Sequence, residues 1–163
     1  MKFSMDSHMQ FPLVELSLNQ GETVYIQRGS MVYHTPNVSL NTQLNASGSG
    51  LGRFVKAVGR SMVSGESTFI TQAVAESDNG NLALAPDTPG QVIALELGEK
   101  QYRLNDGAFL ALDGTASYTM ESQSIGTGEG VVNTFRGTGE VYVQSLNLQS
   151  FAGSLNKYIQ KGS

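Results

Sequence analysis

The chain has 163 residues, a formal net charge of −4 and no cysteine, and 39% of its residues are hydrophobic. This length suits one domain with a packed interior. The acidic balance argues against a nucleic-acid binder, which needs a basic surface to neutralise phosphates. Without cysteine the chain can form no disulfide and no Cys-ligated zinc site. No run approaches the roughly 20 apolar residues of a spanning helix. The N-terminus is too polar for a signal peptide, so we expect a cytoplasmic protein.

The first part of the chain reads as short β-strands joined by tight turns. Alternating or β-rich segments predict strands at 11–18, 23–27, 30–34 and 38–44. Gly29 stands between two of these segments, where the reversal of the chain needs a residue that tolerates positive φ.

A loop of glycine and serine residues then leads into 51–63, which predicts a short helix with an apolar stripe and an opposing basic stripe. This segment has three basic residues and no acidic one, so it could contact a membrane surface or an acidic protein partner. The alternative is a solvated outer face above a core-packed apolar stripe. The candidate contact residues are Arg53, Phe54, Lys56, Val58, Arg60 and Met62.

Strands resume at 67–74 and 82–85, with Asn79-Gly80 as a hairpin turn between them. The second half then predicts strands at 91–97, around Tyr102 and Phe109, and at 131–135 and 140–144. Apolar residues at helical spacing predict a C-terminal helix over 149–159, which we expect to cover its own sheet or that of a neighbouring copy.

An internal duplication organises these elements. Gly21-Glu22 followed by Tyr25 returns as Gly98-Glu99 followed by Tyr102, and in each copy a later glycine opens the next strand. We place one pseudo-repeat near 14–85 and the other near 91–144. The Gly/Ser loop and the basic segment are extra in the first half. An insertion of this kind is a place where repeat proteins add function, and the alternative is a cap on an open sheet edge.

In the order and spacing of these motifs the chain resembles the AIM24 family, whose bacterial members have a β fold similar to that of the tryptophan RNA-binding attenuation protein (TRAP-like). The resemblance implies an all-β, double-sheet β-sandwich in a single domain over 1–163. It also implies a homo-oligomer, with a trimer favoured. The segments that carry it are 11–15, 21–25, 29–33, 65–67, 84–86, 89–90 and 107–110, with the Gly-rich stretch into the basic helix.

No catalytic or metal-binding constellation stands out. The two histidines, His8 and His34, show none of the spacings typical of zinc or non-haem iron sites. No nucleophile elbow occurs between a strand and a helix. The four glutamates that recur after glycine, at 22, 66, 99 and 129, fit turn residues that accept backbone N–H bonds. We therefore expect no catalytic residue, metal or cofactor.

These observations favour a non-enzymatic, oligomeric β scaffold or binding module. The alternative is a small-molecule-binding protein or an enzyme with a pocket between its sheets.

Overall fold

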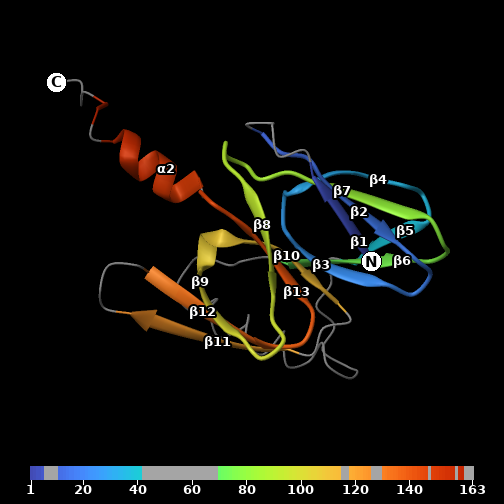
Figure 1. Ribbon diagram of the computed structural model, residues 1–163. Coiled ribbons are helices and arrows are strands. Elements are labelled where there is room, and N and C mark those ends of the chain that lie inside the picture. Colours follow the sequence, from blue (N-terminus) through green and yellow to red (C-terminus); the bar gives the residue numbers. More distant parts are fainter. Residues whose placement is uncertain are drawn as a thin grey trace.

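The computed structural model describes residues 1–5, 11–41, 70–114, 118–125, 130–146, 148–156 and 158–159. Most of these residues lie in antiparallel strands, which confirms the all-β prediction (Figure 1). The strands of the first half are β1 (Lys2–Met5), β2 (Val14–Leu18), β3 (Thr23–Gln27), β4 (Met31–His34), β5 (Val38–Asn41), β6 (Ile70–Ala75) and β7 (Gly80–Leu84).

The second half contains β8 (Val92–Glu96), β9 (Gln101–Asn105), β10 (Phe109–Asp113), β11 (Tyr118–Ile125), β12 (Gly130–Gly137) and β13 (Glu140–Gln144). A 3-10 turn, η2 (Asp106–Ala108), precedes β10. The predicted C-terminal helix is present as α2 (Leu148–Leu155) and therefore ends before residue 159. The predicted helix over 51–63 lies outside the described residues.

The described strands form three sheets, where the resemblance implied two. Their strand orders are β1-β2-β7-β4, β5-β6-β3-β10-β13-β8 and β11-β12-β9. The six-stranded sheet is the central layer, since residues on its two faces enter two different cores. Val24 and Ile26 belong to the first core, whereas Tyr25 between them belongs to the second. Successive side chains of a strand point to opposite faces, so each face of this sheet packs against one of the smaller sheets.

Burial on both faces explains the composition of the central strands. In β3, β10 and β13 at least three consecutive side chains are buried. Such strands read as continuous apolar runs, for example Phe109-Leu110-Ala111-Leu112. β2 has one buried face, and its side chains alternate strictly between buried and exposed. The apolar alternation of Val14, Leu16 and Leu18 therefore identified the strand and its inner face correctly.

The strand pairing of the first half recurs in the second. β2 and β4 flank β7 as β8 and β10 flank β13. Likewise, β3 and β5 flank β6 as β9 and β11 flank β12. Even an irregularity recurs, because the β4–β7 ladder shifts register between Met31 and Tyr33, and the β10–β13 ladder shifts between Phe109 and Ala111. This agreement supports our proposal that 14–85 and 91–144 are pseudo-repeats.

The two shifted ladders align the halves with an offset of 78 residues in this part of the repeat, so that Met31 corresponds to Phe109. Residues 28–30 connect β3 to β4 and residues 106–108 connect β9 to β10, so the same offset holds for β3 and β9. Tyr102 therefore corresponds to Val24 and not to Tyr25. The Gly-Glu motifs are offset by one residue from the strands that follow them, whereas Gly29 and Gly107 correspond.

Among the described strands, one ladder joins the two halves: β3 of the first half pairs with β10 of the second. Each half supplies two three-stranded groups, and this β3–β10 junction fuses one group from each half into the six-stranded sheet. The remaining two groups stay separate, which is why three sheets form. At one end of the junction the Gly114 N–H donates to the Thr23 carbonyl oxygen at 2.7 Å.

Substitution at Gly114 tests how tightly the junction is packed. A Cβ at Gly114 would lie 2.6 Å from the Thr23 carbonyl oxygen, so the backbones would have to separate. We expect Gly114→Ala to lower the free energy of unfolding by about 1–3 kcal/mol, the usual cost of overpacking. Gly153→Ala is the control, because a Cβ there meets nothing within 4 Å and α2 should gain up to about 1 kcal/mol. Equal urea midpoints for the two variants would contradict this account.

Glu22 has the structural role that its place in a turn predicts. Its Oε2 accepts the Asn19 N–H at 2.7 Å, and its Oε1 pairs with the N-terminal ammonium of Met1. The hydrogen bond from this ammonium, followed by that from Asn19, holds the pKa of Glu22 below its ordinary value of 4.5. The ionised carboxylate therefore stabilises the fold above its unfolded pKa, and this contribution is lost as pH falls through the lower folded pKa.

We expect Glu22→Gln to reduce the free energy of unfolding at pH 7 by about 0.5 kcal/mol, which is typical of a partly exposed ion pair. At pH 3 the two proteins should be closer in stability, because the parent carboxylate is then becoming protonated. Urea titrations at both values measure the difference. A gap that is as large at pH 3 as at pH 7 would contradict this role of the carboxylate.

Candidate functional site

The predicted basic contact residues, Arg53, Phe54, Lys56, Val58, Arg60 and Met62, lie outside the described residues. The structure does show where their segment joins the sheet. Asn41, the last residue of β5, pairs with Gln72 of the neighbouring strand β6. The connection over 42–69 therefore leaves and rejoins the six-stranded sheet at one place on its edge. The corresponding β11–β12 connection spans only 126–129.

A surface that the sequence analysis did not single out lies on β4. All four side chains of this strand are exposed, including Met31, Val32 and Tyr33. β4 is the last strand of its sheet, and no described strand pairs with its outer edge. An apolar edge strand of this kind is a template for pairing with another chain.

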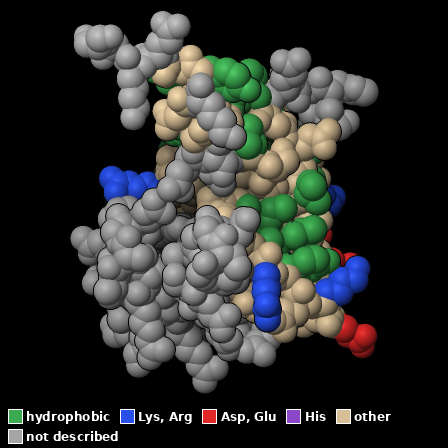
Figure 2. Space-filling model, turned by 90° about the vertical axis from the view of Figure 1, so that its left-hand side faces the viewer, with side chains coloured by type: hydrophobic (Ala, Val, Ile, Leu, Met, Phe, Trp, Pro, Cys, Tyr) green, Lys and Arg blue, Asp and Glu red, His purple; other side chains and the backbone are tan. Residues whose placement is uncertain are grey.

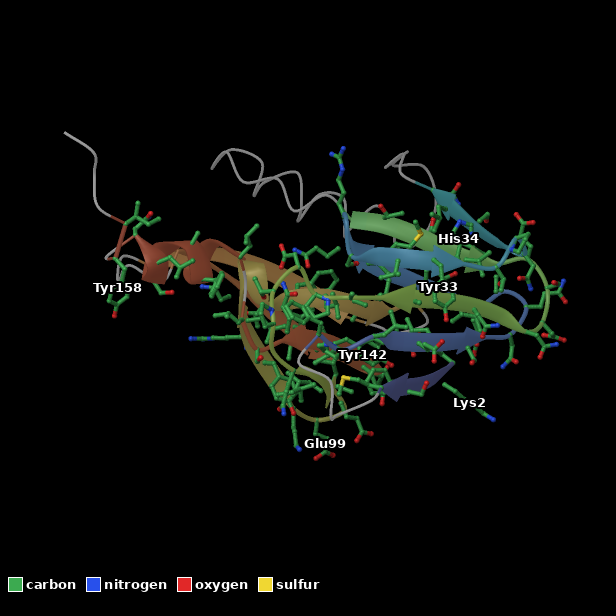
Figure 3. The ribbon with its side chains drawn as sticks, turned by 90° about the horizontal axis from the view of Figure 1, so that it is seen from above. Lys2, Tyr33, His34, Glu99, Tyr142 and Tyr158 are labelled. Carbon is green, nitrogen blue, oxygen red and sulfur yellow. The ribbon has the colours of Figure 1, made fainter. Side chains whose placement is uncertain are left out.

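Tyr33 anchors the outer face of this sheet. Its hydroxyl donates to the Glu15 carboxylate on β2, across the intervening strand β7. Glu15 and Tyr33 both pair with Ala83, so the ring lies over this small, fully buried residue. The hydrogen bond raises the pKa of the Tyr33 hydroxyl, which stays protonated at neutral pH. Figure 3 shows Tyr33 beside His34, on the part of the molecule away from Tyr158.

A second apolar surface is formed by α2 and the residues after it. The helix projects from the sheets toward the C-terminus (Figure 1). Leu148 and Leu155 are exposed, as are Tyr158 and Ile159 beyond the helix. Figure 2 looks onto the side from which α2 projects, and hydrophobic side chains are visible there among polar ones. We expected this helix to cover its own sheet or that of a neighbouring copy. These four side chains do not cover the sheet of their own chain.

The β3–β10 junction carries a buried polar clasp. The Gln144 side chain, only 4% exposed, donates from Nε2 to the Gly107 carbonyl oxygen at 2.7 Å and to Gln27 Oε1 at 3.3 Å. These contacts tie β13 to the η2 turn that precedes β10 and to the end of β3. Gln144 Oε1 is buried and has no hydrogen-bond partner among the described protein atoms. Such an oxygen can accept a hydrogen bond from a water or a small polar ligand.

Tyr142 fills the first core and is the largest fully buried side chain described. Its ring lies 5.0 Å from that of Phe3, which fixes β1 against the central sheet. Its hydroxyl donates to Glu140 Oε2 at 2.7 Å. Burial first, and then this carboxylate, raise the pKa of Tyr142 well above its ordinary value. The hydroxyl is therefore held as a neutral donor.

His34 lies on β4, and its Nδ1 is 2.9 Å from the Thr35 carbonyl oxygen. His8 lies outside the described residues, as do Glu66 and Glu129. Within the part of the chain that the structure describes, no three His, Asp or Glu side chains come together in a group that could hold a metal ion. Within the same part, no helix has the length and apolar character to cross a bilayer.

The family model described as mitochondrial biogenesis AIM24 matches residues 3–128. An uncharacterized protein of Streptococcus pyogenes serotype M6 is 49% identical, in an alignment that covers all of this chain and 93% of that protein. The X-ray crystal structure of another Streptococcus pyogenes protein is 50% identical and has a TM-score of 0.63. That match covers 97% of this chain and 99% of the other. The motifs, the all-β fold and these matches agree, and the chain belongs to the AIM24 family.

Proposed function

We propose that the protein is a non-enzymatic β scaffold that works as a homo-oligomer, with a trimer favoured. The observation that carries this proposal is the apolar surface on two regular elements, β4 and α2. Single exposed apolar side chains are normal on a protein surface. Here three of them follow one another along β4, whose outer edge pairs with no described strand, and two more stand at the ends of the projecting helix α2. Apolar side chains gathered in this way are typical of surfaces that a partner covers.

The length of α2 supports the same proposal. A helix of eight residues is marginal in water by itself and depends on packing of its apolar side chains. Leu148 and Leu155 lie on this helix, and Tyr158 and Ile159 continue the apolar character beyond it. A neighbouring copy that buries these side chains would supply the packing that the helix needs.

Light scattering at micromolar concentrations tests the oligomer. We expect the parent chain to have the mass of a trimer, and Leu155→Glu to weaken the assembly at least tenfold, because it places a charge in a surface that becomes buried. Asn156→Glu adds the same charge at a neighbouring exposed polar position and serves as the control. A parent chain that is monomeric at every concentration would contradict the proposal.

The segment over 51–63 is the proposed contact with a membrane surface or an acidic protein partner. The support is its composition, with Arg53, Lys56 and Arg60 in a segment that has no acidic residue. Each basic side chain near an anionic surface contributes about 1 kcal/mol, and salt screens the attraction.

Co-sedimentation with anionic liposomes at low salt tests this contact. We expect the parent chain to bind and a variant with Arg53, Lys56 and Arg60 all changed to Gln to lose most of the binding. Neutral liposomes are the control for non-specific sedimentation. Equal binding by both proteins, or binding by neither, would remove the membrane contact from the proposal.

The alternative function is binding of a small polar molecule. The observation that favours it is Gln144 Oε1, which is buried without a partner beside Gln27 and Gly107. Native mass spectrometry of the purified protein distinguishes the two functions. The scaffold proposal predicts the mass of the bare polypeptide, in multiples set by the oligomer. A small molecule bound at one copy per chain would contradict it and support the alternative.

A further inference from the structure

The β3–β10 junction shows how one half of this molecule recognises the other. β3 and β9 occupy the same place in the two pseudo-repeats, and so do β4 and β10. In the junction the first half contributes the edge of β3, and the second half contributes the edge of β10, which is the counterpart of β4. After it has formed, each half has one of these two edges left: β4 in the first half and β9 in the second. Both are terminal strands of their sheets.

We propose that β9 of one copy pairs with β4 of the next copy in an antiparallel ladder that repeats the β3–β10 junction. This inference rests on the proposed homo-oligomer and names its interface. The junction pairs Ile26 with Ala111, Tyr25 with Leu112 and Val24 with Asp113. The offset of 78 residues converts these pairs into Leu104 with Tyr33, Arg103 with His34 and Tyr102 with Thr35.

Burial at corresponding positions shows what the β4 edge lacks. Val32 is 53% exposed, whereas Leu110, its counterpart in β10, is fully buried. Tyr33 is 42% exposed, and its counterpart Ala111 is also fully buried. β4 and β10 each flank the middle strand of their group on one side. Only β10 has a described strand on its other side and a described sheet on each of its faces, whereas the outer edge of β4 is open and its side chains are exposed.

The β9 edge shows the complementary difference. Its counterpart β3 has three consecutive buried side chains, whereas β9 has only Leu104 buried, with Tyr102 partly buried and Arg103 exposed. The proposed register places the β4 aromatic Tyr33 beside the apolar Leu104. Directly opposed side chains on adjacent strands lie about 5 Å apart at Cβ, so this pair would bury apolar surface of both residues.

The geometry of one chain makes this contact head-to-tail. β4 and β9 lie in different sheets, which cover opposite faces of the six-stranded sheet. They do not pair with each other, so the junction cannot be repeated within one chain. A contact between two different edges joins successive copies, and it closes into a ring when the rotation permits. Each contact would fuse β1-β2-β7-β4 of one copy with β9-β12-β11 of its neighbour.

The proposed contact differs from the β3–β10 junction at two positions. Pro36 corresponds to Gly114, and proline has no N–H to repeat the bond that Gly114 donates to Thr23. The ladder between copies therefore ends at Thr35. Ala85 corresponds to Gln144, so the polar clasp is also absent. Both differences make the contact between copies the weaker of the two and favour its separation before the chain unfolds.

Disulfide trapping tests the proposed register, since the chain has no cysteine of its own. Directly opposed residues of an antiparallel pair have Cα atoms about 4.5–5.5 Å apart, within the range that a disulfide spans. We expect the double variant His34→Cys/Arg103→Cys to form covalent oligomers under mild oxidation, including a closed trimer, on non-reducing gels. His34→Cys/Gln101→Cys is the matched control, because its cysteines lie two positions out of register.

A second pair of variants tests the edge without cysteine chemistry. Val32→Lys adds a charge at a position that is exposed in one chain, so folding should be preserved and circular dichroism unchanged. We expect it to raise the dissociation constant of the assembly at least tenfold. Ile93→Lys is the control, because Ile93 is similarly exposed on β8, outside the proposed contact.

The outcomes of these experiments distinguish a failure of the β4–β9 contact from a failure of the proposed homo-oligomer. Trapping at 34/103 without trapping at 34/101, together with loss of assembly in Val32→Lys, supports the β4–β9 contact. An oligomeric parent chain with no trapping at 34/103, or with unchanged assembly in Val32→Lys, overturns the contact and leaves the homo-oligomer standing. A monomeric parent chain overturns both.

Discussion

The antiparallel ladder between β3 and β10 is the contact on which the rest of this structure depends. Among the described strands it is the one ladder that crosses from the first half to the second. It converts two three-stranded groups into a six-stranded sheet, and both hydrophobic cores pack against that sheet. A group of three strands with one covered face is close to the minimum for independent stability. Fusion gives each half a core that extends over the strands of the other.

The same constraint accounts for the uneven surface of the molecule. Two equivalent halves carry equivalent edges, yet one ladder satisfies only one edge of each half. β10 is therefore buried at the centre, while β4 leaves Val32 and Tyr33 exposed at the end of a sheet. α2 extends the exposed apolar surface on another side of the molecule. Together these surfaces are the ones that the proposed scaffold of several copies would bury.

Local sequence patterns were sufficient for much of the fold. The alternation in β2 identified its buried face, and Gly29 and Asn79 have the positive φ that their turns predicted.

β1 was missed, because four residues carry little periodicity and its position depends on distant contacts such as Phe3 with Tyr142. The third sheet was missed because it follows from which edges pair. The β4 surface was missed as well, since Met31-Val32-Tyr33 has the composition of an ordinary half-buried strand. The basic segment identified from sequence lies outside the described residues.

Hydrogen–deuterium exchange of the native protein is the most direct measurement of the central claim, that the β3–β10 pairing recurs between copies. Backbone amides that are hydrogen-bonded in a ladder exchange slowly, whereas those of an open edge exchange fast. At high protein concentration, we expect β4 and β9 to exchange more slowly than the edge strand β8, and dilution below the dissociation constant to remove this protection. β4 and β9 amides that exchange as fast as those of β8 at every concentration would contradict it.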